Sequence, residues 1–255
     1  MGRFYTDGVE FTGALDEDTG RVRKIESPFE RVPIGREFDL HELRYLPPII
    51  PSKIVCVGLN YADHARELGL QPPDEPLIFL KPPSAITAHG GDIVYPRASK
   101  RVEYEGELAV VVGKKYVDVT KSNAHEMILG YTALNDVTAR DLQERDGQWT
   151  RSKSFDTFAP MGPWIATVDE VEDCGSLAIR TFLNDEKRQD SNTKNFIFDV
   201  PELMEFISGV MTLLPGDVIT TGTPPGVGVM RPGDVVKVEI EGIGILVNHV
   251  VVRDE

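Results

Sequence analysis

The most informative stretch of the chain reads Arg101-Val102-Glu103-Tyr104-Glu105-Gly106-Glu107-Leu108-Ala109, and it continues into Val110-Val111-Val112. The apolar run is typical of a strand that enters a protein core. Side chains two residues apart on a strand point to the same side, so we expect Glu105 and Glu107 on one face, with Glu103 beside them if the strand is regular. Neighbouring like charges repel each other unless a cation or solvent compensates them. The stretch therefore indicates either a cation site or an exposed, charged edge strand.

A second expected strand delivers another carboxylate. The run Tyr131-Thr132-Ala133-Leu134 is apolar, and Asn135-Asp136 follows at its end. Asp136 can complete a site of three carboxylates with Glu105 and Glu107, which favours the cation site. Oxygen ligands suit Mg²⁺ or Mn²⁺, with water or substrate in the remaining octahedral positions. Zn²⁺ is disfavoured, because zinc sites normally include histidine or cysteine.

Composition limits the class of protein. The chain has 255 residues, of which 41% are hydrophobic and 27% charged, as is typical of a globular protein with a full core. Its net charge of -14 argues against binding nucleic acid or an anionic membrane, since both need a positive surface. The N-terminus lacks the apolar run of a signal peptide, and no apolar stretch approaches the ~20 residues that span a bilayer. We therefore expect a cytoplasmic protein.

Proline and glycine divide the chain into many short segments. Residues 1–50 are polar and mixed with strand-like runs, and we expect a small N-terminal β-rich domain there. A proline-bounded connector, 46–51, leads into a second, larger expected domain, 51–255. Numerous short strands with few helices predict an α+β fold dominated by β-structure, without regular βαβ alternation.

Four helices are expected. In the first, Asn60 caps a helix over residues 61–68, and Gly69 ends it. The others are expected over residues 123–129, 138–145 and 200–211.

Several further side chains can carry chemistry. His64 and Glu67 stand three apart on one face of an expected helix, as either a general-base pair or an ordinary surface contact. Lys153 is either a solvated surface lysine or a charge within a site.

Arg140 and Gln143 are also three apart on an expected helix. They either bind a ligand or lie on the surface, with Arg140 paired to Asp136 or Glu144. The segment Thr221-Gly222-Thr223-Pro224-Pro225-Gly226 lacks the ending of a phosphate-binding loop, so nucleotide binding is unsupported.

Together, four ordered motifs resemble the fumarylacetoacetate hydrolase family, close to its acylpyruvate hydrolases and 2-hydroxyhepta-2,4-diene-1,7-dioate isomerases. The resemblance covers about residues 52–250 and implies mixed sheets rolled into a barrel or sandwich with short helices. The motifs are Tyr104-Glu105-Gly106-Glu107-Leu108, Asn135-Asp136-Val137-Thr138-Ala139-Arg140-Asp141, Ser152-Lys153-Ser154-Phe155-Asp156-Thr157-Phe158 and Thr221-Gly222-Thr223-Pro224-Pro225-Gly226-Val227-Gly228.

The resemblance also implies a role for each candidate residue. It implies three ligands of Mg²⁺ or Mn²⁺, namely Glu105, Glu107 and Asp136. It implies three residues that hold the substrate's carboxylate, namely Arg140, Gln143 and Thr223. His64 and Glu67 would lie on a lid and activate water or move protons, and Lys153 would stabilise negative charge on the substrate. Relatives are usually homodimers, so we expect a homodimer here.

A metal with three protein ligands leaves room for a 2-oxo acid to chelate it through one carboxylate oxygen and the 2-oxygen. The resemblance therefore implies an enzyme that works through a metal-bound enolate, and we favour C–C bond hydrolysis of an acylpyruvate-type substrate. Isomerisation of a 2-hydroxy-diene-dioate from aromatic catabolism, or decarboxylation or tautomerisation of oxaloacetate, are the alternatives. A metal-stabilised binding protein without turnover is the non-enzymatic alternative.

Overall fold

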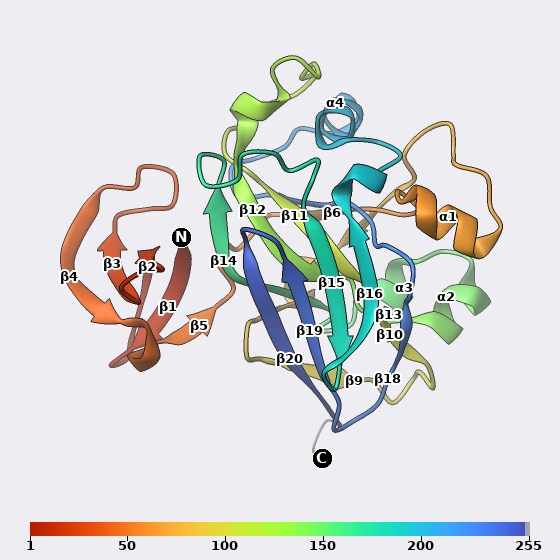
Figure 1. Cartoon of the computed structure of the whole chain (residues 1–255), viewed down its shortest axis with the longest axis horizontal. Coiled ribbons are helices and arrows are strands. Elements are labelled where there is room, and N and C mark those ends of the chain that lie inside the picture. Colours follow the sequence, from red (N-terminus) through yellow and green to blue (C-terminus); the bar gives the residue numbers. More distant parts are fainter. Residues whose placement is uncertain (253–255) are drawn as a thin grey trace.

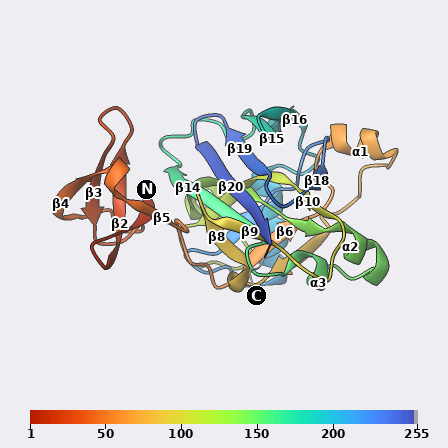
Figure 2. The ribbon, with the colours of Figure 1, turned by 90° about the horizontal axis from the view of Figure 1, so that it is seen from below.

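A computed structural model describes residues 1–252, and strands dominate it (Figure 1). The first five strands form an antiparallel sheet of their own, in the order β4-β3-β2-β1-β5. Phe4, Phe11, Val22 and Leu43 form its small core. Figure 2 shows this sheet beside the rest of the protein. Its strands are β1 (Gly2–Thr6), β2 (Val9–Asp16), β3 (Arg21–Ile25), β4 (Pro33–Asp39) and β5 (Arg44–Leu46).

A seven-stranded mixed sheet crosses the centre of the protein, in the order β7-β6-β17-β11-β12-β14-β8. Its two central strands, β11 (Gly106–Val112) and β12 (Ile128–Asn135), are buried along their whole length. The other strands are β6 (Ile54–Val57), β7 (Ile78–Lys81), β8 (Ile86–Ala88), β14 (Ala159–Thr167) and β17 (Val218–Thr220). Because both faces of β11 and β12 are covered, a polar side chain at their ends is enclosed by protein.

A second five-stranded sheet, in the order β16-β15-β19-β20-β9, lies across β11 and β12 (Figure 1). The apolar residues between the two sheets form the largest core cluster, which includes Leu108, Val110, Ile179, Val238 and Leu246. Its strands are β9 (Asp92–Tyr95), β15 (Ala178–Leu183), β16 (Glu186–Asn192), β19 (Val235–Ile240) and β20 (Gly244–Val252). Three short strands form a further sheet: β10 (Val102–Tyr104), β13 (Thr138–Ala139) and β18 (Gly228–Met230). The predicted α+β fold with curled, packed sheets is confirmed.

Four short α-helices complete residues 1–252: α1 (Ala62–Leu68), α2 (Arg140–Asp146), α3 (Thr150–Lys153) and α4 (Val200–Val210). The expected helix over 200–211 is confirmed, and a capping box between Asp199 and Glu202 starts it. The described segments also include four 3₁₀ turns: Leu40–Glu42, Pro83–Ala85, Ala124–Met127 and Thr193–Asn195. No helix in the described part of the chain is long and apolar enough to cross a membrane.

The first expected helix needs one correction. It ends at Gly69, as predicted, because glycine readily adopts the left-handed backbone found there, with φ of 67°. Asn60 does not cap it: the capping position is Tyr61. The Asn60 side chain instead donates to the carbonyl of Thr221 at 2.8 Å and accepts from the amide of Phe198 at 2.8 Å. The Asn60 side chain therefore bonds with residues distant in sequence and does not bond with the start of the helix.

Three other expectations differ from the structure. The predicted strand over 101–112 is broken at Glu105 into β10 and β11, which belong to different sheets. The helix expected over 123–129 is a 3₁₀ turn, Ala124–Met127, that leads directly into β12. The helix expected over 138–145 starts two residues later, because Thr138 and Ala139 pair with β10. The division into domains 1–50 and 51–255 stays a prediction.

A buried carboxylate fastens the connector after Pro51 to the central sheet. Asp217 accepts hydrogen bonds from the Ser52 amide at 3.1 Å, the Ser52 hydroxyl at 2.6 Å and the Leu214 amide at 2.8 Å. It also pairs with the Lys53 ammonium. Burial alone raises the pKa of Asp217, but its hydrogen bonds from Lys53, Ser52 and Leu214 outweigh burial and hold that pKa below its usual range.

Replacing Asp217 by asparagine is expected to reduce the free energy of unfolding by about 2–4 kcal/mol, because an amide nitrogen would face buried donors. A lowered folded-state pKa stabilises the fold fully above the unfolded pKa of about 3.9, and this contribution is lost as pH falls below it. Urea unfolding of wild type at pH 7 and pH 3 should therefore show an acid loss that Asp217→Asn diminishes. The exposed control Asp18→Asn should match wild type at both pH values.

Candidate metal centre and substrate pocket

Three buried carboxylates meet where β11 begins and β12 ends. Glu105, Glu107 and Asp136 are 7%, 1% and 0% exposed, and one oxygen from each lies within 4.8 Å of the others. The strand register explains this meeting, since Gly106 of β11 pairs with Asn135 of β12. The Asp136 amide donates to the Glu105 carbonyl at 2.8 Å, and the Asn135 side chain accepts from the Glu105 amide at 2.9 Å. The structure thus assembles the trio expected from the sequence.

Gly106, the first residue of β11 after the strand break at Glu105, packs tightly against the facing sheet. A Cβ atom at Gly106 would lie 2.2 Å from the Thr181 hydroxyl on the facing sheet, so no larger residue fits without rearrangement. The Gly106 amide donates to the Gln189 side chain at 3.1 Å. Gln189 in turn donates to the Thr223 hydroxyl at 2.9 Å, and that hydroxyl donates to the Gly106 carbonyl at 2.9 Å. A buried polar network therefore holds the backbone beside the trio, and sequence reasoning missed Gln189.

Two cations from α2 and α3, the buried Lys153 and the partly buried Arg140, contact the trio. The Lys153 ammonium is 2.7 Å from Glu105 Oε2 and 2.8 Å from Asp136 Oδ2. Arg140 contacts the other oxygen of Glu105 and lies 2.7 Å from Glu103 Oε2. Lys153 is therefore not a surface lysine, and the partners of Arg140 are Glu103 and Glu105, not Asp136 or Glu144. The strand break explains why Glu103 stands with Arg140, outside the trio.

A third cation, Lys81 at the end of β7, was not singled out from the sequence. Lys81 is 1% exposed, and its ammonium contacts Asp136 Oδ1 and donates to the Val137 carbonyl at 3.1 Å. Lysine is rarely buried without a charged partner. The available signal was a lysine closing the apolar run Ile78-Phe79-Leu80, but that pattern names no partner. Asp136 is therefore held by lysine on both of its oxygens.

The charges within the trio are unequal. Burial raises the pKa of Glu105, but Lys153 and Arg140 outweigh it and bring the value to about 2. The pKa of Glu107 is raised well above its usual range, first by burial and then by Asp136 and Glu105. Glu107 accepts the Gly222 amide at 3.0 Å, and no lysine or arginine pairs with it among residues 1–252. A hard divalent cation fits this donor set, because it would stabilise the carboxylate that the protein leaves uncompensated.

Helix α1 brings a histidine and a carboxylate to the same pocket. His64 Nδ1 lies 2.8 Å from Glu67 Oε2, and the second oxygen of Glu67 accepts the Gly226 amide at 3.1 Å. A Cβ atom at Gly226 would lie 2.1 Å from the Arg188 carbonyl, so this contact requires glycine. Glu67 therefore orients the imidazole, and Nε2 is the ring atom left for proton transfer.

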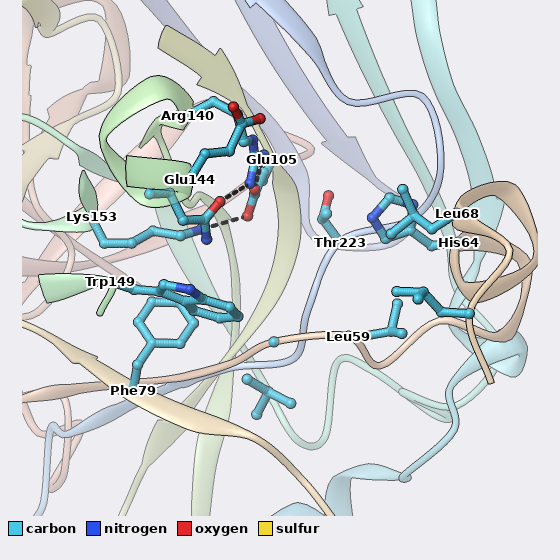
Figure 3. Close-up of a pocket in the computed structure, with 14 residues that line it drawn as sticks. Leu59, His64, Leu68, Phe79, Glu105, Arg140, Glu144, Trp149, Lys153 and Thr223 are labelled. Carbon is cyan, nitrogen blue, oxygen red and sulfur yellow. Dashed lines mark hydrogen bonds and ion pairs between the residues drawn. The ribbon is translucent and has the colours of Figure 1, made fainter. Parts of the chain in front are cut away.

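These groups surround a cavity of about 380 Å³ (Figure 3). Five of the six residues predicted for catalysis and substrate binding line this cavity: His64, Arg140, Gln143, Lys153 and Thr223. The sixth, Glu67, does not line it but contacts His64. Of the three carboxylates, Glu105 lines the cavity, and Lys153 links it to Asp136. Its polar lining residues are His64, Glu105, Arg140, Gln143, Glu144, Lys153 and Thr223.

The chain matches a known family model over most of its length. The family model for the C-terminal part of fumarylacetoacetate (FAA) hydrolase matches residues 53–251. The chain is 47% identical over 222 residues to the mitochondrial oxaloacetate tautomerase of Bos taurus, covering 82% of this chain and 70% of the relative.

Two of the solved structures that share the whole fold illustrate the range of reactions among them. One is 5-carboxymethyl-2-hydroxymuconate delta-isomerase from Mycobacterium smegmatis, with 44% identity, a TM-score of 0.91, and coverage of 100% of this chain and 99% of the other. The second is maleylpyruvate hydrolase from Sphingobium sp. SYK-6 in complex with manganese(II) and pyruvate, with 29% identity, a TM-score of 0.83 and 99% coverage of both chains.

Lys81→Met is expected to weaken Mn²⁺ binding by about 10- to 100-fold, because Asp136 would lose a partner that fixes its orientation. Electron paramagnetic resonance of free Mn²⁺ during titration measures the dissociation constant. The control Lys121→Met removes a solvent-exposed pair with Glu202 and should bind Mn²⁺ like wild type. Equal affinity of Lys81→Met and wild type, in folded protein, would show that Lys81 does not position Asp136.

Proposed function

The chain belongs to the fumarylacetoacetate hydrolase family, and from this premise we propose that it is a divalent-metal-dependent enzyme acting on a small 2-oxo acid through its enolate. The meeting of Glu105, Glu107 and Asp136 beside Lys153, at one end of a cavity, carries the proposal. When bound, Mg²⁺ or Mn²⁺ supplies a Lewis acid for the substrate's carboxylate and 2-oxygen.

The cationic side chains bind and stabilise the anionic substrate. Lys153 lines the cavity with its ammonium already between Glu105 and Asp136, where it stabilises negative charge that develops on the 2-oxygen. Arg140 and Gln143 line the same end, and a guanidinium matches a carboxylate well. The Thr223 hydroxyl donates a hydrogen bond to the Gly106 carbonyl, so this hydroxyl must rotate before it can donate to a substrate.

His64 is the proposed proton carrier. Glu67 holds Nδ1, so Nε2 takes a proton from C3 of the substrate or returns one there. The Gly226 amide fixes Glu67 in turn, which joins α1 to the loop that carries Thr223. The pair therefore acts as a positioned acid and base within one cavity.

Keto–enol tautomerisation of a short 2-oxo acid, such as oxaloacetate, is the reaction that the comparisons favour. Relatives named for proton-transfer reactions are 47% and 44% identical to this chain, whereas two solved structures named as hydrolases are 37% and 29% identical. Proton transfer at C3 also needs no group beyond the metal end of the cavity and His64.

C–C bond hydrolysis of an acylpyruvate is the second candidate, and it was the one favoured on sequence. The specific observation in its favour is the carboxylate–imidazole pair, since the same Nε2 can take a proton from water. Water would then attack the C4 carbonyl, the C3–C4 bond would break, and the enolate of pyruvate would leave with its charge stabilised beside Lys153.

Oligomeric state and location complete the proposal. We propose a cytoplasmic homodimer that takes a small-molecule substrate and does not bind nucleic acid or membranes. The net charge of -14 supports the absence of binding to nucleic acid and to anionic membranes. Light scattering coupled to gel filtration measures the mass, and a monomer at micromolar concentration would contradict the dimer.

The proposed function predicts that metal-loaded protein accelerates exchange of C3 protons of 2-oxo acids with deuterated water, measured by nuclear magnetic resonance above the uncatalysed rate. Formation of pyruvate from acylpyruvates, assayed in parallel, reports hydrolysis. His64→Gln should reduce the rate of either reaction by about 10²- to 10⁴-fold. His125→Gln, on an exposed turn, is the matched control and should keep full activity.

Measuring the Mn²⁺ affinity of the variant shows whether a loss of activity comes from lost catalysis or from lost metal binding. His64→Gln should bind Mn²⁺ like wild type, because His64 does not contact the three carboxylates. If metal-loaded wild type accelerated neither reaction for any 2-oxo acid, the binding-protein alternative would replace the enzyme.

A further inference from the structure

The cavity has two chemically distinct ends. The metal end carries Arg140, Gln143 and Lys153, and the remainder of the lining is largely apolar. We propose that substrate atoms beyond the fourth carbon meet this apolar part, so that the enzyme accepts a neutral, apolar extension and rejects a carboxylate there. The proposal rests on the proposed function, because the metal end is taken to hold the 2-oxo acid group. The apolar part consists of Val57, Gly58, Leu59, Leu68, Leu70, Phe79 and Trp149.

Two closely packed aromatic rings form one side of the apolar part. Phe79 and Trp149 pack edge to face, with centroids 5.2 Å apart and an interplanar angle of 75° (Figure 3). A Cβ atom at Gly58 would lie 3.3 Å from the Trp149 ring, so the indole is closely packed on that side. The Lys153 ammonium lies 5.1 Å from the Phe79 centroid and marks where the charged end meets this aromatic wall.

Leucines on and after α1 form the opposite, more exposed side. Leu68 and Leu70 line the cavity although each is 53% exposed, so part of their apolar surface still faces water. A neutral group placed between these leucines and Trp149 would cover that surface, and each Å² removed from water is worth about 25 cal/mol. The two sides therefore favour an apolar extension of the substrate.

The charges of the lining work against a distal carboxylate. Arg140 and Lys153 already face Glu103, Glu105 and Asp136. Glu144, which also lines the cavity, has one ion-pair contact, at 3.3 Å to Arg101. A carboxylate at the apolar part would lose water without gaining a lysine or arginine among the residues that line the cavity.

The number of carbon atoms in a diacid substrate determines whether its second carboxylate reaches the apolar part. A four-carbon diacid ends at C4, so its second carboxylate stays near Arg140, Gln143 and Lys153. A seven-carbon diacid would carry its second carboxylate past Phe79 into the apolar part. The inferred substrate class is therefore short 2-oxo acids and acylpyruvates with apolar acyl groups, and long diene-dioates are excluded.

The direct test compares two acylpyruvates of equal chain length, one ending in a methyl group and one in a carboxylate. We expect kcat/KM of metal-loaded wild type to be at least about tenfold higher for the methyl-ended compound, since a tenfold ratio needs only 1.4 kcal/mol. An equal or higher value for the carboxylate-ended compound would overturn the inference and leave the enolate chemistry intact.

A gain-of-function variant locates the effect. Leu68→Lys places a cation beside the apolar part at a half-exposed position that should tolerate it. We expect it to raise kcat/KM for the carboxylate-ended compound about tenfold and to lower it for the methyl-ended one. Leu80→Lys is the matched control, because Leu80 is 46% exposed on β7 and does not line the cavity. An equal effect of both variants would show that general charge, and not this wall, sets the preference.

A binding measurement keeps the inference separate from the proposed function. If wild type turned over no 2-oxo acid, the proposed function would fail. Calorimetric affinities of the same two compounds for Mn²⁺-loaded protein would then decide the inference: tighter binding of the methyl-ended compound supports it, and equal or tighter binding of the carboxylate-ended compound contradicts it.

Discussion

Burying three carboxylates within 4.8 Å of one another is the constraint on which the rest of the site depends. Such charges repel strongly away from water, and each needs a partner. The protein supplies Lys81 and Lys153 to Asp136, and Lys153 and Arg140 to Glu105. Glu107 receives a backbone amide, which leaves one anion for a divalent cation to stabilise. Two of these cationic residues, Lys153 and Arg140, also line the cavity.

The fold serves this constraint by placing the trio at the ends of its two most central strands. The antiparallel register of β11 and β12 brings Gly106 opposite Asn135, so residues far apart in sequence become neighbours. Around them, Gln189 and Thr223 satisfy the backbone that the break at Glu105 exposes. Helix α1 then covers the cavity from the far side, with Glu67 tied to Gly226. The central strands therefore carry the proposed metal ligands, and a short helix carries the proposed proton-transfer pair.

Local patterns were sufficient to predict part of this arrangement. The acidic strand start, Asp136 at a strand end, helix α4 and the glycine end of α1 follow from residues near one another in sequence. The close approach of Gly106 to Thr181 and the burial of Lys81 beside Asp136 involve residues far apart in sequence. Strand β16 is polar and carries Gln189 inward, so alternation of apolar residues does not reveal it. The features that sequence reasoning missed are those set by tertiary contacts.

The central claim is that the three carboxylates together hold the catalytic cation. Crystals soaked with Mn²⁺ and oxalate, which resembles the enolate of a 2-oxo acid, test it through the anomalous signal of manganese. The account predicts one strong peak in contact with oxygens of Glu105, Glu107 and Asp136, with oxalate bound to the same ion and facing Lys153. Manganese bound elsewhere, or oxalate bound away from these carboxylates, would contradict the account.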